Sequence, residues 1–139
     1  MTIRNTLDWV DSLRPKVPTL SPAELADRLE RGEKLTLIDI RELQELIDSG
    51  KIAGSYHVPR GMLEFWADPA MEYYRRYFTE DAEYVVYCAG GARSVLAATA
   101  LMDMGYEKVW HLDGGFGAWK EAGLPVEDAA ATSRWQRKP

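Results

Sequence analysis

The fold of this chain is decided by Leu35-Thr36-Leu37-Ile38-Asp39-Ile40. This short, almost continuous apolar run is typical of a strand that is buried on both faces of a sheet. Three further segments rich in apolar, β-branched or aromatic residues predict strands at residues 55–58, 84–88 and 109–112. Helical patterns alternate with these strands at residues 41–48, 93–104 and 116–122. The alternation predicts an α/β fold with a mainly parallel sheet.

The segments before and after this core complete the domain organisation. The first 14 residues place apolar side chains at helical spacing, and Pro15 and Pro18 end that helix. The segment around Val17–Leu20 can supply a short fifth strand at the edge of the sheet. We therefore expect three parts: a helical extension at residues 1–18, one domain at residues 19–126 with helices on both faces of a five-stranded sheet, and a polar tail at residues 127–139.

Residues 61–79 are dense in large apolar side chains, and Asp68-Pro69 interrupts them. We predict two short helices here, on one side of the sheet. Two interpretations of these helices stay open. They cover the sheet, which is the favoured interpretation, or they form the wall of a substrate pocket.

The composition excludes several classes of protein. The chain has 139 residues, of which 46% are hydrophobic and 28% charged, as in a soluble globular domain. Its formal net charge of −5 gives no electrostatic reason to expect nucleic acid as a partner. No apolar run approaches the roughly 18 residues that span a bilayer. Asp8 and Asp11 interrupt the region where a secretory signal has its apolar core, so we expect a cytoplasmic protein without a membrane partner.

The only cysteine, Cys88, ends a predicted strand, and Ala89-Gly90-Gly91-Ala92 connects it to a helix that begins near Arg93. Ligands of open α/β sheets bind beyond the carboxyl ends of the strands. Glycines let such a loop curl tightly, so several backbone N–H groups can point at one anion. A reachable sulfur at the base of this loop is favoured as a thiolate and can act as a nucleophile. The alternative is a buried cysteine without chemistry, which is common for free cysteines but less consistent with this position.

The same loop offers groups that can bind an anionic substrate. We expect the backbone amides of residues 89–94 to surround the sulfur and the substrate oxygens. Arg93 carries the only formal charge of the loop, and its forked guanidinium suits a sulfonate, sulfate or carboxylate. Ser94 can cap the helix or donate a hydrogen bond to the anion. His57 and His111 lie on predicted strands, and we expect them to be packed residues rather than catalytic bases.

Three ordered motifs carry a resemblance to a known family. Cys88-Ala89-Gly90-Gly91-Ala92-Arg93-Ser94 resembles the active-site loop of the rhodanese-like domains, which often has the form Cys-x-x-Gly-x-Arg-Ser. Asp39-Ile40-Arg41-Glu42, followed by the segment from Gly50 to Pro59, resembles a second family motif. Leu112-Asp113-Gly114-Gly115 with Trp119 resembles a third. The resemblance covers about residues 19–126.

The resemblance implies a three-layer rhodanese-like fold and a sulfurtransferase of the thiosulfate type. Cys88 would take the outer sulfur of thiosulfate, release sulfite and hold the sulfur as a persulfide. A thiol or cyanide would then accept that sulfur. Asp39 and Arg41 would support neighbouring loops without taking part in the chemistry. The reaction requires no metal and no organic cofactor, and a protein that donates or accepts a persulfide is a further possible partner.

Two alternatives remain open for the function. A persulfide carrier or a regulatory interaction module would turn over little free thiosulfate. A cysteine-based phosphatase or arsenate reductase is less favoured, because related phosphatases have the spacing Cys-x5-Arg. Here four residues separate Cys88 from Arg93. The shorter loop leaves less room for a tetrahedral phosphate and suits a single added sulfur.

Overall fold

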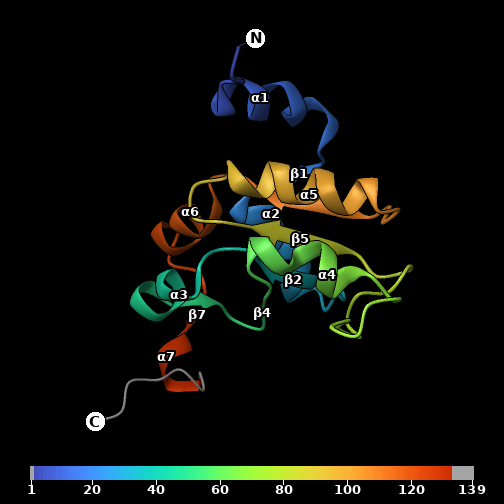
Figure 1. Ribbon diagram of the computed structural model, residues 1–139. Helices are drawn as coiled ribbons and strands as arrows, with labels where there is room; N and C mark the ends of the chain where they lie inside the picture. Colours follow the sequence, from blue (N-terminus) through green and yellow to red (C-terminus); the bar gives the residue numbers. More distant parts are fainter. Residues whose placement is uncertain (1, 133–139) are drawn as a thin grey trace.

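A single five-stranded sheet forms the centre of the protein in the computed structural model, which describes residues 2–132 (Figure 1). Its strands lie in the order β1-β6-β5-β2-β4, and every neighbouring pair is parallel. The strands are β1 (Thr19–Leu20), β2 (Thr36–Asp39), β4 (Tyr56–His57), β5 (Tyr84–Tyr87) and β6 (Val109–Leu112). The predicted α/β fold is confirmed, including the short edge strand β1. All five carboxyl ends therefore meet at one edge of the sheet.

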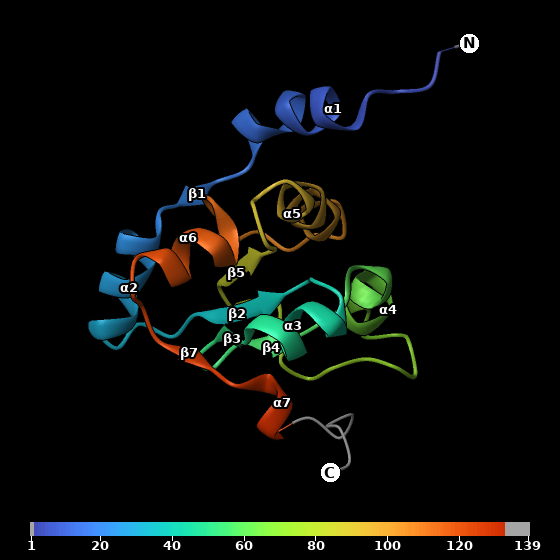
Figure 2. The ribbon, with the colours of Figure 1, turned by 90° about the vertical axis from the view of Figure 1, so that its left-hand side faces the viewer.

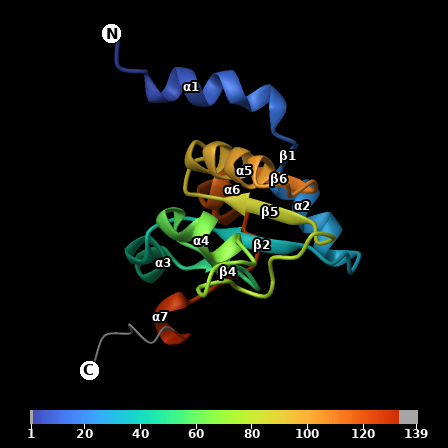
Figure 3. The same cartoon turned by 45° about the vertical axis from the view of Figure 1, so that its right-hand side comes forward.

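Helices cover both faces of this sheet, as Figures 2 and 3 show. One face carries α2 (Pro22–Glu30) and α6 (Gly115–Glu121), and the other carries α4 (Leu63–Ala67) and α5 (Arg93–Asp103). The N-terminal helix α1 (Thr6–Leu13) packs on the outer side of α5 (Figure 1).

The alternation of side chains along the central strand β5 explains why there are two cores. Tyr84 and Val86 are buried on the face of α4 and α5, together with Val95 and Leu101. Val85 and Tyr87 are buried on the opposite face, in a second cluster with residues of α2 and α6 such as Leu25, Phe116 and Trp119. A strand that is buried on both faces needs apolar residues on both faces, and β5 shows this pattern at all four positions.

The prediction of a second helix within residues 61–79 was wrong. A 3₁₀ turn (Arg60–Met62) and α4 are followed by irregular turns up to β5. Asp68 starts a turn, because its carbonyl oxygen and its side chain accept from the amides of Met71 at 3.0 Å and Ala70 at 2.9 Å. Leu63, Ala67 and Phe78 of this region lie in the core beside α5, so it covers one face of the sheet. That it also lines a substrate pocket stays a prediction.

A second, two-stranded sheet was not predicted. It pairs β3 (Lys51–Ile52) with β7 (Val126–Glu127) in antiparallel register, after α3 (Leu43–Ser49) has ended at Gly50. The short helix α7 (Ala129–Thr132) follows β7, so the predicted polar tail begins with regular structure. Residues 133–139 of that tail lie outside the described residues. Between residues 2 and 132, no helix is long and apolar enough to cross a bilayer.

Candidate active site

Cys88 lies where β5 ends, at the edge of the sheet that collects the carboxyl ends of the strands. Asp39 of β2 pairs with Tyr87 in the sheet register, and His111 of β6 pairs with Val86. The first residues of α5 are Arg93 and Ser94, so the loop of residues 89–92 connects the strand directly to the helix. The structure thus brings the end of β5 and the start of α5 together around one sulfur atom.

Carbonyl groups of Cys88 and its loop accept hydrogen bonds from other elements of the fold. The backbone amides of Phe116 and Gly117, at the start of α6, donate to the carbonyl oxygens of Cys88 at 2.8 Å and Ala89 at 3.0 Å. The guanidinium of Arg14 donates to the carbonyl oxygen of Gly91 at 3.3 Å. Helix α6 therefore uses amides that have no partner within the helix to fix the loop.

The amides of the same loop face the sulfur. The backbone N–H of Gly91 donates to Cys88 Sγ at 3.1 Å, and Ser94 Oγ lies 3.5 Å from that sulfur. Burial alone would raise the pKa of the Cys88 thiol. Hydrogen bonds from the Ser94 side chain and from the amides of Ser94, Gly91 and Gly90 together have the larger effect. The net result is a lowered pKa. This geometry favours the thiolate, as a nucleophilic cysteine requires.

The sulfur is less open to solvent than the sequence predicts. Cys88 is 1% exposed, because the loop that stabilises the thiolate also folds back over it. Gly90 is exposed and Ala89 and Ala92 are half-buried, so the loop itself lies at the surface. Access of a small sulfur donor to Sγ stays a prediction.

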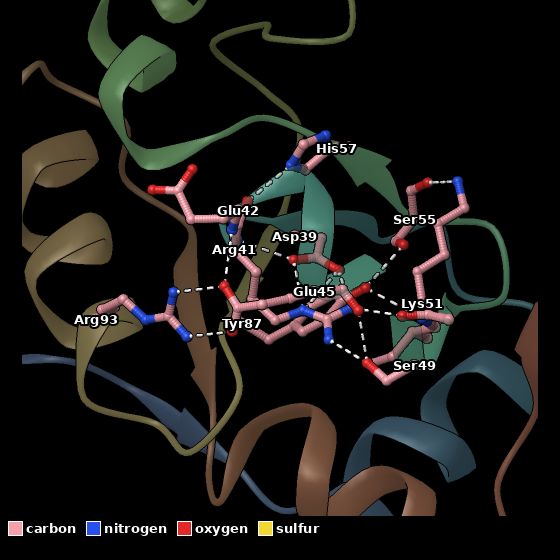
Figure 4. A network of polar contacts seen from close by, with 12 residues as sticks. Asp39, Arg41, Glu42, Glu45, Ser49, Lys51, Ser55, His57, Tyr87 and Arg93 are labelled. Atoms are coloured by element: carbon pink, nitrogen blue, oxygen red, sulfur yellow. Dashed lines mark hydrogen bonds and ion pairs between the residues drawn. The ribbon is translucent and has the colours of Figure 1, made fainter. Parts of the chain in front are cut away.

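The guanidinium of Arg93 is already bound (Figure 4). Its two terminal nitrogens each lie 2.9 Å from a carboxylate oxygen of Glu45 in α3. The hydrogen bond from Arg93 lowers the pKa of Glu45 to about 2, so the pair is ionised at neutral pH. Glu45 thus neutralises the guanidinium charge and accepts one N–H from each terminal nitrogen, so an anionic substrate meets a fork that is already partly used.

Sequence analysis missed Glu45, which is 48 residues away from Arg93 in the chain. The pattern Glu42-x-x-Glu45 indicates only a helix cap, and the Glu45 carboxylate does accept from the amide of Glu42 at 2.9 Å. Sequence analysis also missed Arg14. Its contact with Gly91 joins residues that are 77 positions apart, so no short sequence motif predicts it.

Asp39 and Arg41 form a fully buried ion pair next to the loop (Figure 4). Arg41 Nη2 lies 2.8 Å from Asp39 Oδ2 and donates to the carbonyl oxygen of Gly50 at 2.7 Å. Arg41 Nη1 donates to Ser49 Oγ at 3.2 Å, and the guanidinium lies 4.2 Å from the ring centre of Phe116. The pair thus connects the end of β2, the end of α3 and the start of α6. Its supporting role stays a prediction.

Both histidines are packed and hydrogen-bonded. His57 Nε2 lies 2.7 Å from the carbonyl oxygen of Arg41, and His111 Nδ1 lies 3.1 Å from Ser94 Oγ. Among residues 2–132, no three His, Cys, Asp or Glu side chains are placed to hold a metal ion.

A family model for the rhodanese-like domain matches residues 21–122. This chain belongs to the rhodanese-like domain family. The match includes the loop of Cys88, the Asp39–Arg41 pair and the start of α6, which are the three parts that the structure joins. The predicted rhodanese-like fold is confirmed.

Relatives of this rhodanese-like domain carry different names. It is 33% identical over 110 residues to a sulfurtransferase of Allochromatium vinosum, a match that covers 79% of this chain and 94% of that protein. It is 34% identical over 110 residues to the probable adenylyltransferase/sulfurtransferase MoeZ of Mycobacterium tuberculosis; the match covers 79% of this chain but only 26% of MoeZ. Among solved structures, this chain is 43% identical to a protein of unknown function from Rhodopseudomonas palustris, which is described as a possible tyrosine phosphatase. The two structures match with a TM-score of 0.86, and the match covers 91% of this chain and 98% of that one.

Gly115 lets α6 approach the loop of this rhodanese-like domain. Its φ is +60°, and a Cβ atom there would lie 2.5 Å from the carbonyl oxygen of Cys88 and 2.7 Å from that of Ala89. Because both neighbours are backbone atoms, we expect Gly115→Ala to destabilise the protein by about 2 kcal/mol or more through strain and overlap. We also expect it to slow any reaction of Cys88 about tenfold, since misplacing reacting groups is costly. Chemical denaturation and the rate of sulfur uptake by Cys88 measure the two effects.

Gly90→Ala is the matched control. A Cβ atom at Gly90 has no neighbour within 4 Å, and its φ does not lie in the left-handed region. We expect the stability of this variant to stay within about 1 kcal/mol of the original protein. Equal effects of the two substitutions would contradict the importance of the close approach at Gly115.

Proposed function

We propose that this rhodanese-like domain is a sulfurtransferase that carries a sulfane sulfur on Cys88. The observation that carries the proposal is the hydrogen bond from the Gly91 amide to Cys88 Sγ, within a loop that lowers the pKa of the thiol. The similarity to named sulfurtransferases supports a rhodanese-like sulfurtransferase in general. The donor, the acceptor and the persulfide intermediate belong to the proposal.

The reaction has two half-reactions. The Cys88 thiolate attacks the outer sulfur of thiosulfate, the S–S bond of thiosulfate breaks, and sulfite leaves with the bonding electron pair. An acceptor thiolate or cyanide then attacks the outer sulfur of the Cys88 persulfide and restores the thiolate. A covalent intermediate between two substrates predicts ping-pong kinetics. No proton transfer is required if both sulfur nucleophiles react as anions.

Fixed backbone dipoles stabilise both anionic forms of Cys88 in this proposal. The amides of Gly90, Gly91 and Ser94 stabilise the thiolate and would also stabilise a persulfide anion formed on the same sulfur. Because these groups are held by the loop, they need little reorganisation during the reaction. The structural partners of the loop on α6 and at Arg14 would therefore act on catalysis by keeping the loop rigid.

Turnover with three classes of substrate tests the proposal. We expect thiocyanate to form from cyanide and a sulfane donor, with thiosulfate and glutathione persulfide as the two donors compared. We expect no release of phosphate from a generic aryl phosphate. Phosphate release without thiocyanate would favour a phosphatase, the description given to the Rhodopseudomonas palustris relative. Uptake of sulfur without turnover would instead favour a persulfide carrier.

Glu45 is expected to limit the use of free thiosulfate. Its carboxylate neutralises the Arg93 charge and accepts from both terminal nitrogens, so it weakens the attraction of Arg93 for a dianionic donor. We expect Glu45→Gln to lower the KM for thiosulfate about three- to tenfold, because an ion pair that is 42% and 33% exposed has a modest free energy. Steady-state kinetics at fixed cyanide concentration measure the change.

Asp48→Asn is the matched control, since it removes the same charge from α3. Asp48 accepts from the side chain of Gln44 at 2.8 Å and makes no ion pair with Arg93. We expect its KM for thiosulfate to stay at the original value. A similar decrease in both variants would show that only the net charge of the helix matters.

A further inference from the structure

Ser94 Oγ lies between a sulfur and an imidazole. It is 3.5 Å from Cys88 Sγ and 3.1 Å from His111 Nδ1. Cys88 follows β5, Ser94 lies in α5 and His111 lies in β6, and each of the three is at most 2% exposed. Bulk water therefore does not compete with these contacts, and each polar hydrogen matters.

The single hydroxyl hydrogen of Ser94 can point in two directions. If it points to the Cys88 thiolate, the Ser94 oxygen has to accept a hydrogen bond from His111 Nδ1–H. If it points to His111 Nδ1, only lone pairs of the Ser94 oxygen face the sulfur, and these disfavour a thiolate. The proton position on His111 therefore decides what Ser94 does for Cys88.

His111 is expected to be neutral at neutral pH. Burial lowers its pKa, and the positive charge of Arg14 in the 3₁₀ turn Arg14–Lys16 lowers it further. The negative charge of Asp113, which follows β6, raises the pKa of His111, but this effect is smaller than the other two. A neutral imidazole carries one N–H group, so the choice lies between its two tautomers.

We propose that His111 is a positioning residue, which as the Nδ1–H tautomer directs the Ser94 hydroxyl toward Cys88 Sγ. His111 acts only through Ser94, because Ser94 Oγ is the atom that both groups contact. The inference rests on the proposed role of Cys88 as nucleophile and adds a residue to it. Loop amides and the Ser94–His111 pair then stabilise the thiolate from two sides.

Titration of the Cys88 thiolate by its ultraviolet absorbance tests the inference, with no sulfur donor present. We expect Ser94→Ala to raise the pKa of Cys88 by about one unit, the value of one hydrogen bond to a charged group. We expect His111→Leu to raise it by a similar amount, and the double variant to match Ser94→Ala alone. His111→Asn should keep the original pKa, because its side-chain amide can donate in place of Nδ1–H.

Two results would overturn the inference. One is a His111→Leu variant that unfolds at lower temperature but keeps the pKa of Cys88, which indicates a structural role only. The other is an additive increase in the double variant, which indicates that His111 does not act through Ser94. If His111→Leu does not fold, nitrogen-15 NMR of the original protein decides: an Nδ1–H tautomer supports the inference and an Nε2–H tautomer overturns it.

The same titration separates this inference from the proposed function. A chain whose Cys88 titrates as expected in all four variants, but which takes up no sulfur from any donor, would refute the sulfurtransferase and leave the role of His111 in place. A chain that transfers sulfur with a Cys88 pKa independent of His111 would refute only the inference.

Discussion

Cys88→Ser is expected to reduce sulfur transfer by about three orders of magnitude or more. An alcohol oxygen cannot hold a sulfane sulfur as a persulfide, and its pKa is far too high for it to act as an anion at neutral pH. The serine hydroxyl is close in size to the thiol and can accept from the Gly91 amide, which lies 3.1 Å from Cys88 Sγ. The loop should therefore keep its conformation. Thiocyanate formation from a sulfane donor and cyanide measures the loss.

Thermal unfolding is the control for this variant. We expect the unfolding temperature to change little, because the substitution preserves the contacts of the loop with Phe116 and Gly117 of α6. Cys88 is the only cysteine of the chain, so no second thiol can take over the reaction. A folded variant with more than about a tenth of the original rate would contradict covalent catalysis at this position.

Asp39→Asn is expected to have the largest effect on stability, a loss of about 3–5 kcal/mol in the free energy of unfolding. Asp39 and Arg41 are 0% and 1% exposed, so the guanidinium cannot turn to water when the carboxylate charge is removed. The backbone amide of Arg41 and its Nε atom also donate to Asp39 Oδ1, at 3.0 and 3.1 Å. Urea denaturation at neutral pH measures the loss.

Asp27→Asn provides the matched control on an exposed ion pair. Asp27 Oδ2 of α2 lies 3.0 Å from Nη2 of Arg31, the residue that follows the helix. The Asp27 side chain is 64% exposed and that of Arg31 is 61% exposed. We expect a change of less than about 1 kcal/mol, because solvent screens such pairs. Equal losses in the two variants would contradict the view that the buried pair holds the loops next to Cys88.

Much of the fold could be predicted from the sequence because β2, β5 and β6 lie in short segments rich in apolar residues, each followed by a helical pattern. A strand that is buried on both faces can be recognised from the composition of a few consecutive residues, without knowledge of its distant contacts. The position of Cys88 at a strand end, close before two glycines, also predicts the candidate site.

The remaining features depend on distant contacts. β3 and β7 are two residues long and pair across more than 70 positions, so neither has a local signal. The pairing of Arg93 with Glu45 and the contact of Arg14 with Gly91 are likewise side-chain contacts between separate elements. Residues 73–78 are rich in large aromatic side chains, which is why the sequence predicts a helix there. The structure has turns instead, which begin at Asp68-Pro69.

The intact mass of the protein after incubation with a sulfane donor tests the central claim most directly. We expect the folded original protein to gain about 32 Da, the mass of one sulfur, and to lose it again when cyanide is added. The Cys88→Ser variant should gain nothing. No gain in mass with thiosulfate, glutathione persulfide or any other sulfane donor would contradict a persulfide on Cys88.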